Sequence, residues 1–221
     1  MNDSMPMHGG NACPLTTVTA PDVFTSVTDG LETRGWSVIP DFLPPLLISQ
    51  LRHEVELSWQ EGEFRRAGVG RGSRLLVRPE VRTDWVSWLD LSRCSGVQRT
   101  CLAALETLRQ AINSRLYLGL FDYEGHLAVY PPGTYYHKHL DQFRDIGSRT
   151  VTCILYLNAD WCAADGGQLR IYTDPQDETF YEEVLPLGGQ LVTFLSARFQ
   201  HEVMPARRNR MSLTGWFRQR S

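Results

Sequence analysis

The segment Gly125-His-Leu-Ala-Val-Tyr130 opens a series of six short runs that are alternating or wholly apolar. The other five runs are Thr150–Leu157, Gln168–Tyr172, Glu183–Leu187, Gln190–Leu195 and Met211–Arg218. Clusters of Gly, Pro and Asp stand between them, as is typical of turns that join short strands. This pattern predicts a β-sandwich or barrel, and the double-stranded β-helix, or jelly roll, is one architecture with this number of strands.

The first half of the chain has a different period, with apolar residues three and four positions apart. This spacing predicts helices that start near residue 21 and near residue 46, and a third helix over about 94–115. Trp36–Ile39 is predicted as a short strand, and the Gly-rich segment Arg65–Ser73 as a mobile loop. Helices followed by strands predict an α+β fold. We therefore expect a flexible tail at 1–20 and one domain at 21–221, in which helices at 21–115 support a jelly-roll core at 116–221.

The composition describes an ordinary globular chain. It has 221 residues, 42% of them hydrophobic, and its 22 Lys+Arg against 25 Asp+Glu leave a formal net charge of −3. This balance disfavours binding to nucleic acid through bulk positive charge. No apolar stretch approaches the ~18–20 residues that a membrane-spanning helix needs. The five Cys have neither zinc-ribbon nor C-x-x-C spacing, and no apolar signal segment is visible. We expect a cytoplasmic monomer without a nucleic-acid or membrane partner.

The motif His137-Lys-His139-Leu-Asp141 is the first candidate for chemistry. Residues two apart in a strand point to the same side of a sheet, so His139 and Asp141 would direct an imidazole and a carboxylate to one point. His-x-Asp alone is common by chance, but Phe199-Gln-His201 supplies a second imidazole further along. Two His and one carboxylate on a rigid β-scaffold are the facial ligand set of non-haem Fe(II) oxygenases.

Arg210 follows nine residues after His201, just before the last apolar run. An Arg can hold a carboxylate through two charge-assisted hydrogen bonds, so it would suit a keto acid that carries a second carboxylate. The residues alone leave a different class of protein open, namely a non-catalytic jelly-roll module that holds zinc structurally. Structural zinc sites usually have four protein ligands, and only three are found here, which favours an open metal site.

Eight segments, taken in order, also carry a resemblance to a known family. They are Gly35–Leu43, Val81–Trp88, Tyr130–Asp141, Arg149–Asn158, Asp160-Trp161, Gly166–Ile171, His201–Pro205 and Arg210–Trp216. With these segments the sequence resembles the Fe(II)/2-oxoglutarate-dependent dioxygenases, and among them the prolyl hydroxylases similar to the animal hypoxia-inducible-factor enzymes. The resemblance covers residues 30–218, and its specificity lies in the order of the segments.

The resemblance implies Fe(II) bound by His139, Asp141 and His201, and 2-oxoglutarate bound through its C5 carboxylate by Arg210 and Tyr156. These residues would form the catalytic centre of a hydroxylase that uses O₂ as its oxidant.

Three further residues match pocket positions of the family. Tyr130 falls near the C1 side of 2-oxoglutarate and the substrate mouth, while Thr214 and Trp216 match positions that line the pocket and the substrate entrance. The loop Arg65–Ser73 matches a mobile lid in location only, because its Arg- and Gly-rich sequence is distinct. His53 and His126 are interpreted as structural.

The resemblance also implies a substrate class. It favours C4 hydroxylation of a prolyl residue in a protein, with release of succinate and CO₂ and with ascorbate as an auxiliary reductant. Family analogy suggests a translation factor such as elongation factor Tu, and the alternative is a hydroxylase of free proline or another small molecule. A group of arginines would attract an acidic segment of the substrate or form an ordinary solvated surface: Arg65, Arg66, Arg71, Arg74, Arg207 and Arg208.

Overall fold

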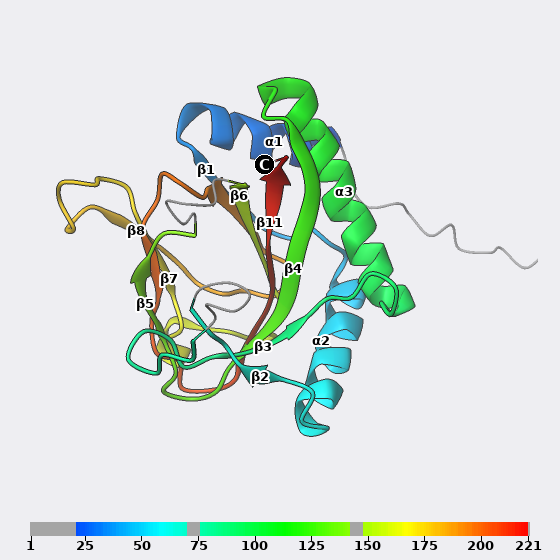
Figure 1. Cartoon of the computed structure of the whole chain (residues 1–221), viewed down its shortest axis with the longest axis vertical. Coiled ribbons are helices and arrows are strands. Elements are labelled where there is room, and N and C mark those ends of the chain that lie inside the picture. Colours follow the sequence, from blue (N-terminus) through cyan, green and yellow to red (C-terminus); the bar gives the residue numbers. More distant parts are fainter. Residues whose placement is uncertain (1–20, 70–75, 142–147, 221) are drawn as a thin grey trace, which may run out of the picture.

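Two antiparallel sheets that face each other form the centre of the computed structural model, which describes residues 21–69, 76–141 and 148–220 (Figure 1). The larger sheet runs in the order β1 (Trp36–Ile39), β9 (Leu191–Leu195), β6 (Arg149–Tyr156), β11 (Arg210–Gln219), β4 (Leu120–Tyr130), β3 (Trp85–Trp88) and β2 (Arg65–Arg66). The smaller sheet runs in the order β5 (Tyr136–His139), β10 (His201–Val203), β7 (Leu169–Tyr172) and β8 (Tyr181–Val184). This arrangement is the predicted double-stranded β-helix.

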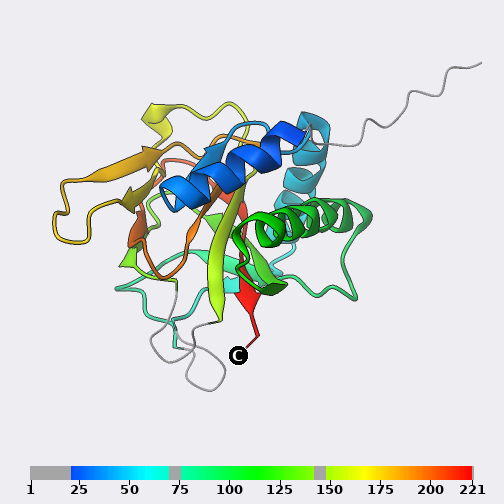
Figure 2. The same ribbon diagram turned by 90° about the horizontal axis from the view of Figure 1, so that it is seen from above.

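Three helices cover the outer face of the larger sheet: α1 (Pro21–Thr33), α2 (Pro45–Gln60) and α3 (Gly96–Leu116) (Figures 1 and 2). Helix α3 begins with a capping box, because the Ser95 hydroxyl accepts from the Gln98 backbone N–H and the Gln98 side chain accepts from the Ser95 N–H. A single 3₁₀ turn, η2, spans Ala163–Asp165. In the described part of the chain, no helix is long and apolar enough to cross a membrane.

Strand β11 shows how alternation divides the interior into two layers. Met211, Leu213 and Phe217 point to the helices and join the apolar core between the helices and the larger sheet. The alternate residues, from Arg210 to Trp216, point toward the smaller sheet. Because the side chains of a strand alternate between its two faces, one strand builds a dry core outside and presents polar groups inside.

Several predicted elements are confirmed, including all three helices, the strand Trp36–Ile39 and a strand that overlaps each of the six runs. The largest boundary error lies in β4, which begins at Leu120 instead of Gly125 because its first residues pair with the end of β11. Strand β8 spans Tyr181–Val184 and therefore starts before the predicted Glu183–Leu187 run.

Strand β10 was not predicted, and β5 was expected only from the spacing of His139 and Asp141, because neither strand has an apolar run. The segment 21–115 also differs from a purely helical support, since β1, β2 and β3 belong to the larger sheet. The predicted loop Arg65–Ser73 begins with strand β2, and its remainder from residue 70 lies outside the described residues.

Candidate active site

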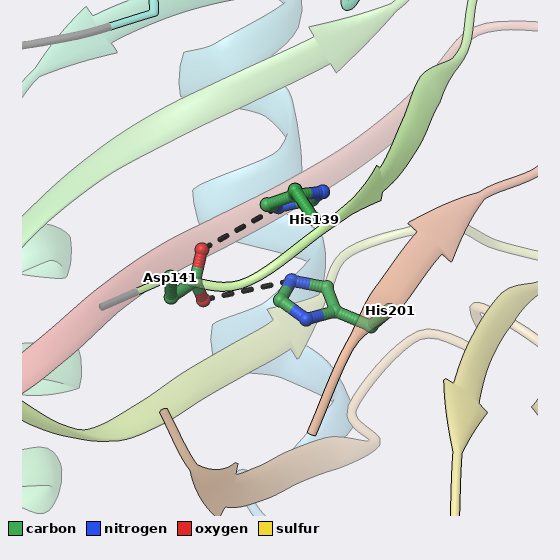
Figure 3. Close-up of side chains that lie close together, drawn as sticks. All are labelled: His139, Asp141 and His201. Atoms are coloured by element: carbon green, nitrogen blue, oxygen red, sulfur yellow. Dashed lines mark ion pairs between the residues drawn. The ribbon is translucent and has the colours of Figure 1, made fainter. Parts of the chain in front are cut away.

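His139, Asp141 and His201 each place one possible ligand atom within 4.8 Å of the other two (Figure 3). His139 ends β5 and lies directly opposite His201 on β10, so the antiparallel register puts both rings on one face of the smaller sheet. Their ring centroids are 4.2 Å apart. The strand prediction for Asp141 was wrong, because β5 ends at His139 and Asp141 lies in the bend that follows.

Both imidazoles are oriented by backbone carbonyls. Nδ1 of His139 lies 2.7 Å from the His137 carbonyl oxygen, and Nδ1 of His201 lies 3.2 Å from that of Phe199. With Nδ1–H as the donor, each Nε2 keeps a lone pair for a metal. The two Nε2 atoms lie 3.5 and 3.6 Å from the two oxygens of Asp141. Nε2 of His139 is buried and makes no hydrogen bond, so the donor set fits a divalent metal such as Fe(II).

Two buried hydroxyl groups form a hydrogen-bonded chain that ends on the Asp141 carboxylate. Thr152 on β6 donates to Oδ2 of Asp141 over 2.8 Å, and its own oxygen lies 2.9 Å from the Ser196 hydroxyl. Thr152 and Ser196 are both fully buried. This hydrogen bond fixes a carboxylate that lies outside any strand.

The electrostatics of these groups favour a neutral imidazole beside a charged carboxylate. Burial lowers the pKa of His201 to about 4, and the neighbouring His139 adds to this effect. Burial alone would raise the pKa of Asp141, but His201 and His139 outweigh it and hold the pKa well below its usual range. Deprotonated ligands are the forms that bind a metal.

Arg210 lies at the closed end of the same interior and is 1% exposed. Its Nε donates to the Gly167 carbonyl oxygen over 2.8 Å, while its Nη2 is buried and has no hydrogen-bond partner. No carboxylate of the described residues pairs with it. The Tyr156 hydroxyl, on a ring 4.9 Å from the guanidinium carbon, is likewise buried without a partner. A buried charge without a counterion is costly, so these orphaned donors fit the carboxylate of a bound acid.

A cavity of about 470 Å³ is lined by Arg210 and by His139, Asp141 and His201, and so connects the buried guanidinium with the candidate metal site. Of the remaining predicted site residues, Tyr130, Thr214 and Trp216 line it, whereas Tyr156 contacts Arg210 without lining it. Burial raises the pKa of the Tyr130 phenol far above its usual value, so this hydroxyl stays neutral. The structure therefore brings all eight predicted site residues into one region.

Several cavity residues escaped the sequence-based prediction. His126 is buried and forms a cluster of tilted rings with Trp88 and Trp216, whose ring centroids lie 4.8 and 5.6 Å from its own. The interpretation of His126 as structural therefore missed that it belongs to the cavity wall. Arg149 lies 3.4 Å above the Trp216 ring. Tyr136 stacks on His139 at 3.5 Å. The alternation of β4 indicated that His126 shares a face with Tyr130, and this signal was available from the sequence.

The predicted group of arginines does not form one surface. Arg65 and Arg66 line the cavity mouth, whereas Arg208 donates to the carbonyl oxygens of Ala159 and Asp160 elsewhere. The other members divide as follows: Arg207 is exposed and does not line the cavity, while Arg71 and Arg74 lie outside the described residues.

Comparisons with known proteins agree with this geometry. A model of the 2OG-Fe(II) oxygenase superfamily matches residues 125–218. The crystal structure of a Pseudomonas putida prolyl-4-hydroxylase is similar with a TM-score of 0.79 and 42% sequence identity, over 90% of this chain and 100% of that chain. This chain belongs to the prolyl hydroxylases of the 2OG-Fe(II) oxygenase superfamily. The predicted family is thus confirmed.

Two further relatives share less sequence identity with this chain. A prolyl hydroxylase from Trichoplax adhaerens, solved with a peptide fragment of the hypoxia-inducible-factor oxygen degradation domain, has a TM-score of 0.80 and 26% identity, over 90% of each chain. The hypoxia-inducible factor prolyl hydroxylase of Caenorhabditis elegans is 29% identical over 208 residues. Those residues are 88% of this chain, but this chain spans only 28% of the length of that relative.

Proposed function

We propose that this chain is an Fe(II)- and 2-oxoglutarate-dependent hydroxylase that adds oxygen to C4 of a prolyl residue in a protein. The observation that carries the proposal is the pairing of two sites in one cavity. One is the His139, Asp141 and His201 cluster, and the other is the buried, unpartnered guanidinium of Arg210. A structural zinc module needs no buried cation beside its metal.

The cluster supplies two neutral imidazoles and one carboxylate, which would hold Fe(II) by one face and leave other positions to small ligands. Arg210 and Tyr156 would hold the distal carboxylate of 2-oxoglutarate, with the Gly167 carbonyl oxygen keeping the guanidinium in place. Bound Fe(II), 2-oxoglutarate and O₂ supply the oxidising power, with succinate and CO₂ released as the C–H bond is hydroxylated. Thr214 and Trp216 complete the wall that separates this chemistry from solvent.

The proposal that the substrate is a protein is supported by the relatives of this chain. The Trichoplax adhaerens enzyme was solved in complex with a peptide fragment of the hypoxia-inducible-factor oxygen degradation domain. In this chain the cavity is lined in part by Trp88, which is 52% exposed. An exposed indole at a cavity mouth suits a polypeptide that extends beyond the reacting residue. We place translation factors such as elongation factor Tu first among the proteins to be tested.

The test incubates the purified chain with Fe(II), 2-oxoglutarate, ascorbate and proline-containing peptides or candidate proteins, and follows succinate together with hydroxyproline by mass spectrometry. We expect both products to appear together, to depend on Fe(II), and to vanish in His139→Ala. Hydroxylation of free proline at the same efficiency would instead favour a small-molecule hydroxylase. Turnover that survives in His139→Ala would contradict the proposed function.

A further inference from the structure

Two adjacent arginines on β2, Arg65 and Arg66, occupy opposite faces of the larger sheet. Arg65 lies directly across from Val86 on β3, and Arg66 lies across from Trp85. Residues that pair directly in an antiparallel ladder share a face, while successive residues alternate. Val86 is buried in the core between the sheets, so Arg65 is on the cavity side. Trp85 packs against Trp59 of α2, so the Arg66 side chain leaves the strand on the helix side, although Arg66 also lines the cavity mouth.

The two side chains also differ in their partners. The Arg66 guanidinium lies 4.8 Å from the centre of the Trp85 ring and donates to the Thr83 carbonyl oxygen. Arg65 is exposed and forms no ion pair with a carboxylate of the described residues, although Glu63 is nearby in sequence and also lines the cavity.

The remaining cavity arginines have partners. Arg82 donates two hydrogen bonds to Asp84, at 2.7 and 2.6 Å, and Arg149 pairs with Glu124 at 3.5 Å. Under the proposed function Arg210 receives a carboxylate of 2-oxoglutarate. Arg66 also lines the cavity mouth, but its guanidinium contacts the Trp85 ring and the Thr83 carbonyl oxygen. Among the described cavity-lining residues, Arg65 is therefore the arginine whose guanidinium has no such partner.

We propose that Arg65 binds the carboxylate of an Asp or Glu near the target proline, so that the enzyme selects prolyl segments with a neighbouring acidic side chain. The inference rests on the proposed function and specifies its substrate class. A guanidinium offers a planar fork of donors that matches a carboxylate, and at an exposed rim this contact selects between substrates and speeds their association. The charge of Arg82 is balanced by Asp84, and the charges of Arg149 and Arg218 are balanced by Glu124 and Asp122. These arginines therefore compete little with Arg65 for an acidic group.

The test compares peptides that are identical except at one position near the proline, which holds Asp, the isosteric Asn, or Lys. This position is moved stepwise along both sides of the proline. Each peptide is assayed with the wild-type chain, Arg65→Gln, Arg65→Glu and the matched control Arg66→Gln. Arg66→Gln loses the same charge one residue away at the same cavity mouth, but from a guanidinium that already contacts Trp85 and Thr83.

At one or more positions, we expect the wild-type chain to show a KM for the Asp peptide about three- to tenfold below that for the Asn peptide, with similar kcat. Arg65→Gln removes this difference, Arg65→Glu reverses it in favour of Lys, and added salt weakens it. Arg66→Gln keeps it. Melting curves show whether each variant is folded, and both side chains are exposed.

Equal KM values for Asp and Asn peptides at every position would overturn this inference and leave the proposed function intact. An equal loss of preference in Arg65→Gln and Arg66→Gln would also overturn it, because the effect would then come from net charge and not from contact. If no prolyl peptide or protein were hydroxylated at all, the proposed function would fail and this inference with it.

Discussion

At the scale of single residues, Asp141 shows how the orientation of a proposed metal ligand depends on its neighbours. It lies beyond the end of β5, so no sheet hydrogen bonds hold its backbone in register. Its orientation depends on Thr152, which in turn is bonded to Ser196. Hydrogen bonds to ligating carboxylates commonly change metal affinity when they are removed.

Thr152→Val keeps the shape of the side chain and removes its hydroxyl. We expect the affinity for Fe(II), or for Mn(II) as a stable substitute, to fall about 10- to 100-fold, while Thr152→Ser retains most of it. The measurement is a metal titration by calorimetry without substrate. Thr193→Val is the matched control, because Thr193 is an equally buried strand hydroxyl that bonds to Ser37 away from the site. Unchanged metal affinity in folded Thr152→Val would show that Asp141 needs no such support.

Arg210 is the second residue-scale case, because its charge and its shape have separate roles. Arg210→Lys keeps the charge but loses the planar fork, so we expect KM for 2-oxoglutarate to rise about tenfold or more. Tyr156→Phe removes one orphaned donor and is expected to raise that KM about three- to tenfold. Steady-state kinetics with varied 2-oxoglutarate provide both values. A KM for 2-oxoglutarate that neither variant changes would place the acid elsewhere.

At the scale of elements, the pairing of β4 with β11 depends on two glycines that face each other. Gly125 lies opposite Gly215, and the Tyr123 ring packs over both. A Cβ on Gly215 would lie 2.4 Å from the Tyr123 hydroxyl oxygen and 2.5 Å from the Glu124 carbonyl oxygen. The two glycines thus make room for the Tyr123 ring on the helix side of the sheet. The other face of β11 carries Thr214 and Trp216, which line the cavity.

Gly215→Ala is expected to lower the free energy of unfolding by about 1–3 kcal/mol, because the added methyl group meets backbone as well as side chain. Urea unfolding followed by circular dichroism measures the change. Gly96→Ala serves as the control, since a Cβ at Gly96 meets nothing within 4 Å. Equal stability of the two variants would mean that the ring moves aside at no cost.

At the scale of the whole molecule, burial of neutral histidines between the sheets links stability to pH. Burial lowers the pKa of His126 to about 3, and the positive charge of Arg82 adds to this effect. An unfolded chain would titrate this residue near its ordinary value of 6.5. Below that pH the unfolded state binds a proton at His126, whereas the native state does not. The contribution of His126 to stability is therefore fully present above about pH 6.5 and is lost as the pH falls toward about 3.

For His126 alone we expect a loss of about 2 kcal/mol in the free energy of unfolding between pH 7 and pH 5. His126→Gln should remove this part of the pH dependence, while His53→Gln, a change on the exposed side of α2, should leave it unchanged. Urea unfolding of the metal-free protein at several pH values measures both. Parallel pH profiles for wild type and His126→Gln would show that His126 is protonated in the native state.

The sequence predicted secondary structure best where apolar residues recur at one constant spacing over many residues. The three helices and most strands of the larger sheet follow from apolar spacing, because each buries a continuous face. Strands β5 and β10 could not be found in this way, since their side chains serve the site and leave no apolar period. The residues His139, Asp141 and His201 were identified by residue type and family motif, and the reason given for Asp141, a continuing strand, was wrong.

By itself the sequence determined the α+β class through its local periods. The family, the jelly roll and the residues proposed as metal ligands followed from residue types in motifs along the chain. Tertiary structure alone decided that Thr152 supports Asp141, that His126 joins the cavity wall, and that the guanidinium of Arg66 contacts Trp85 and Thr83 while that of Arg65 does not. Each of these depends on register between strands far apart in the chain. A shift of one residue reverses the face of every side chain in a strand, and no local pattern encodes it.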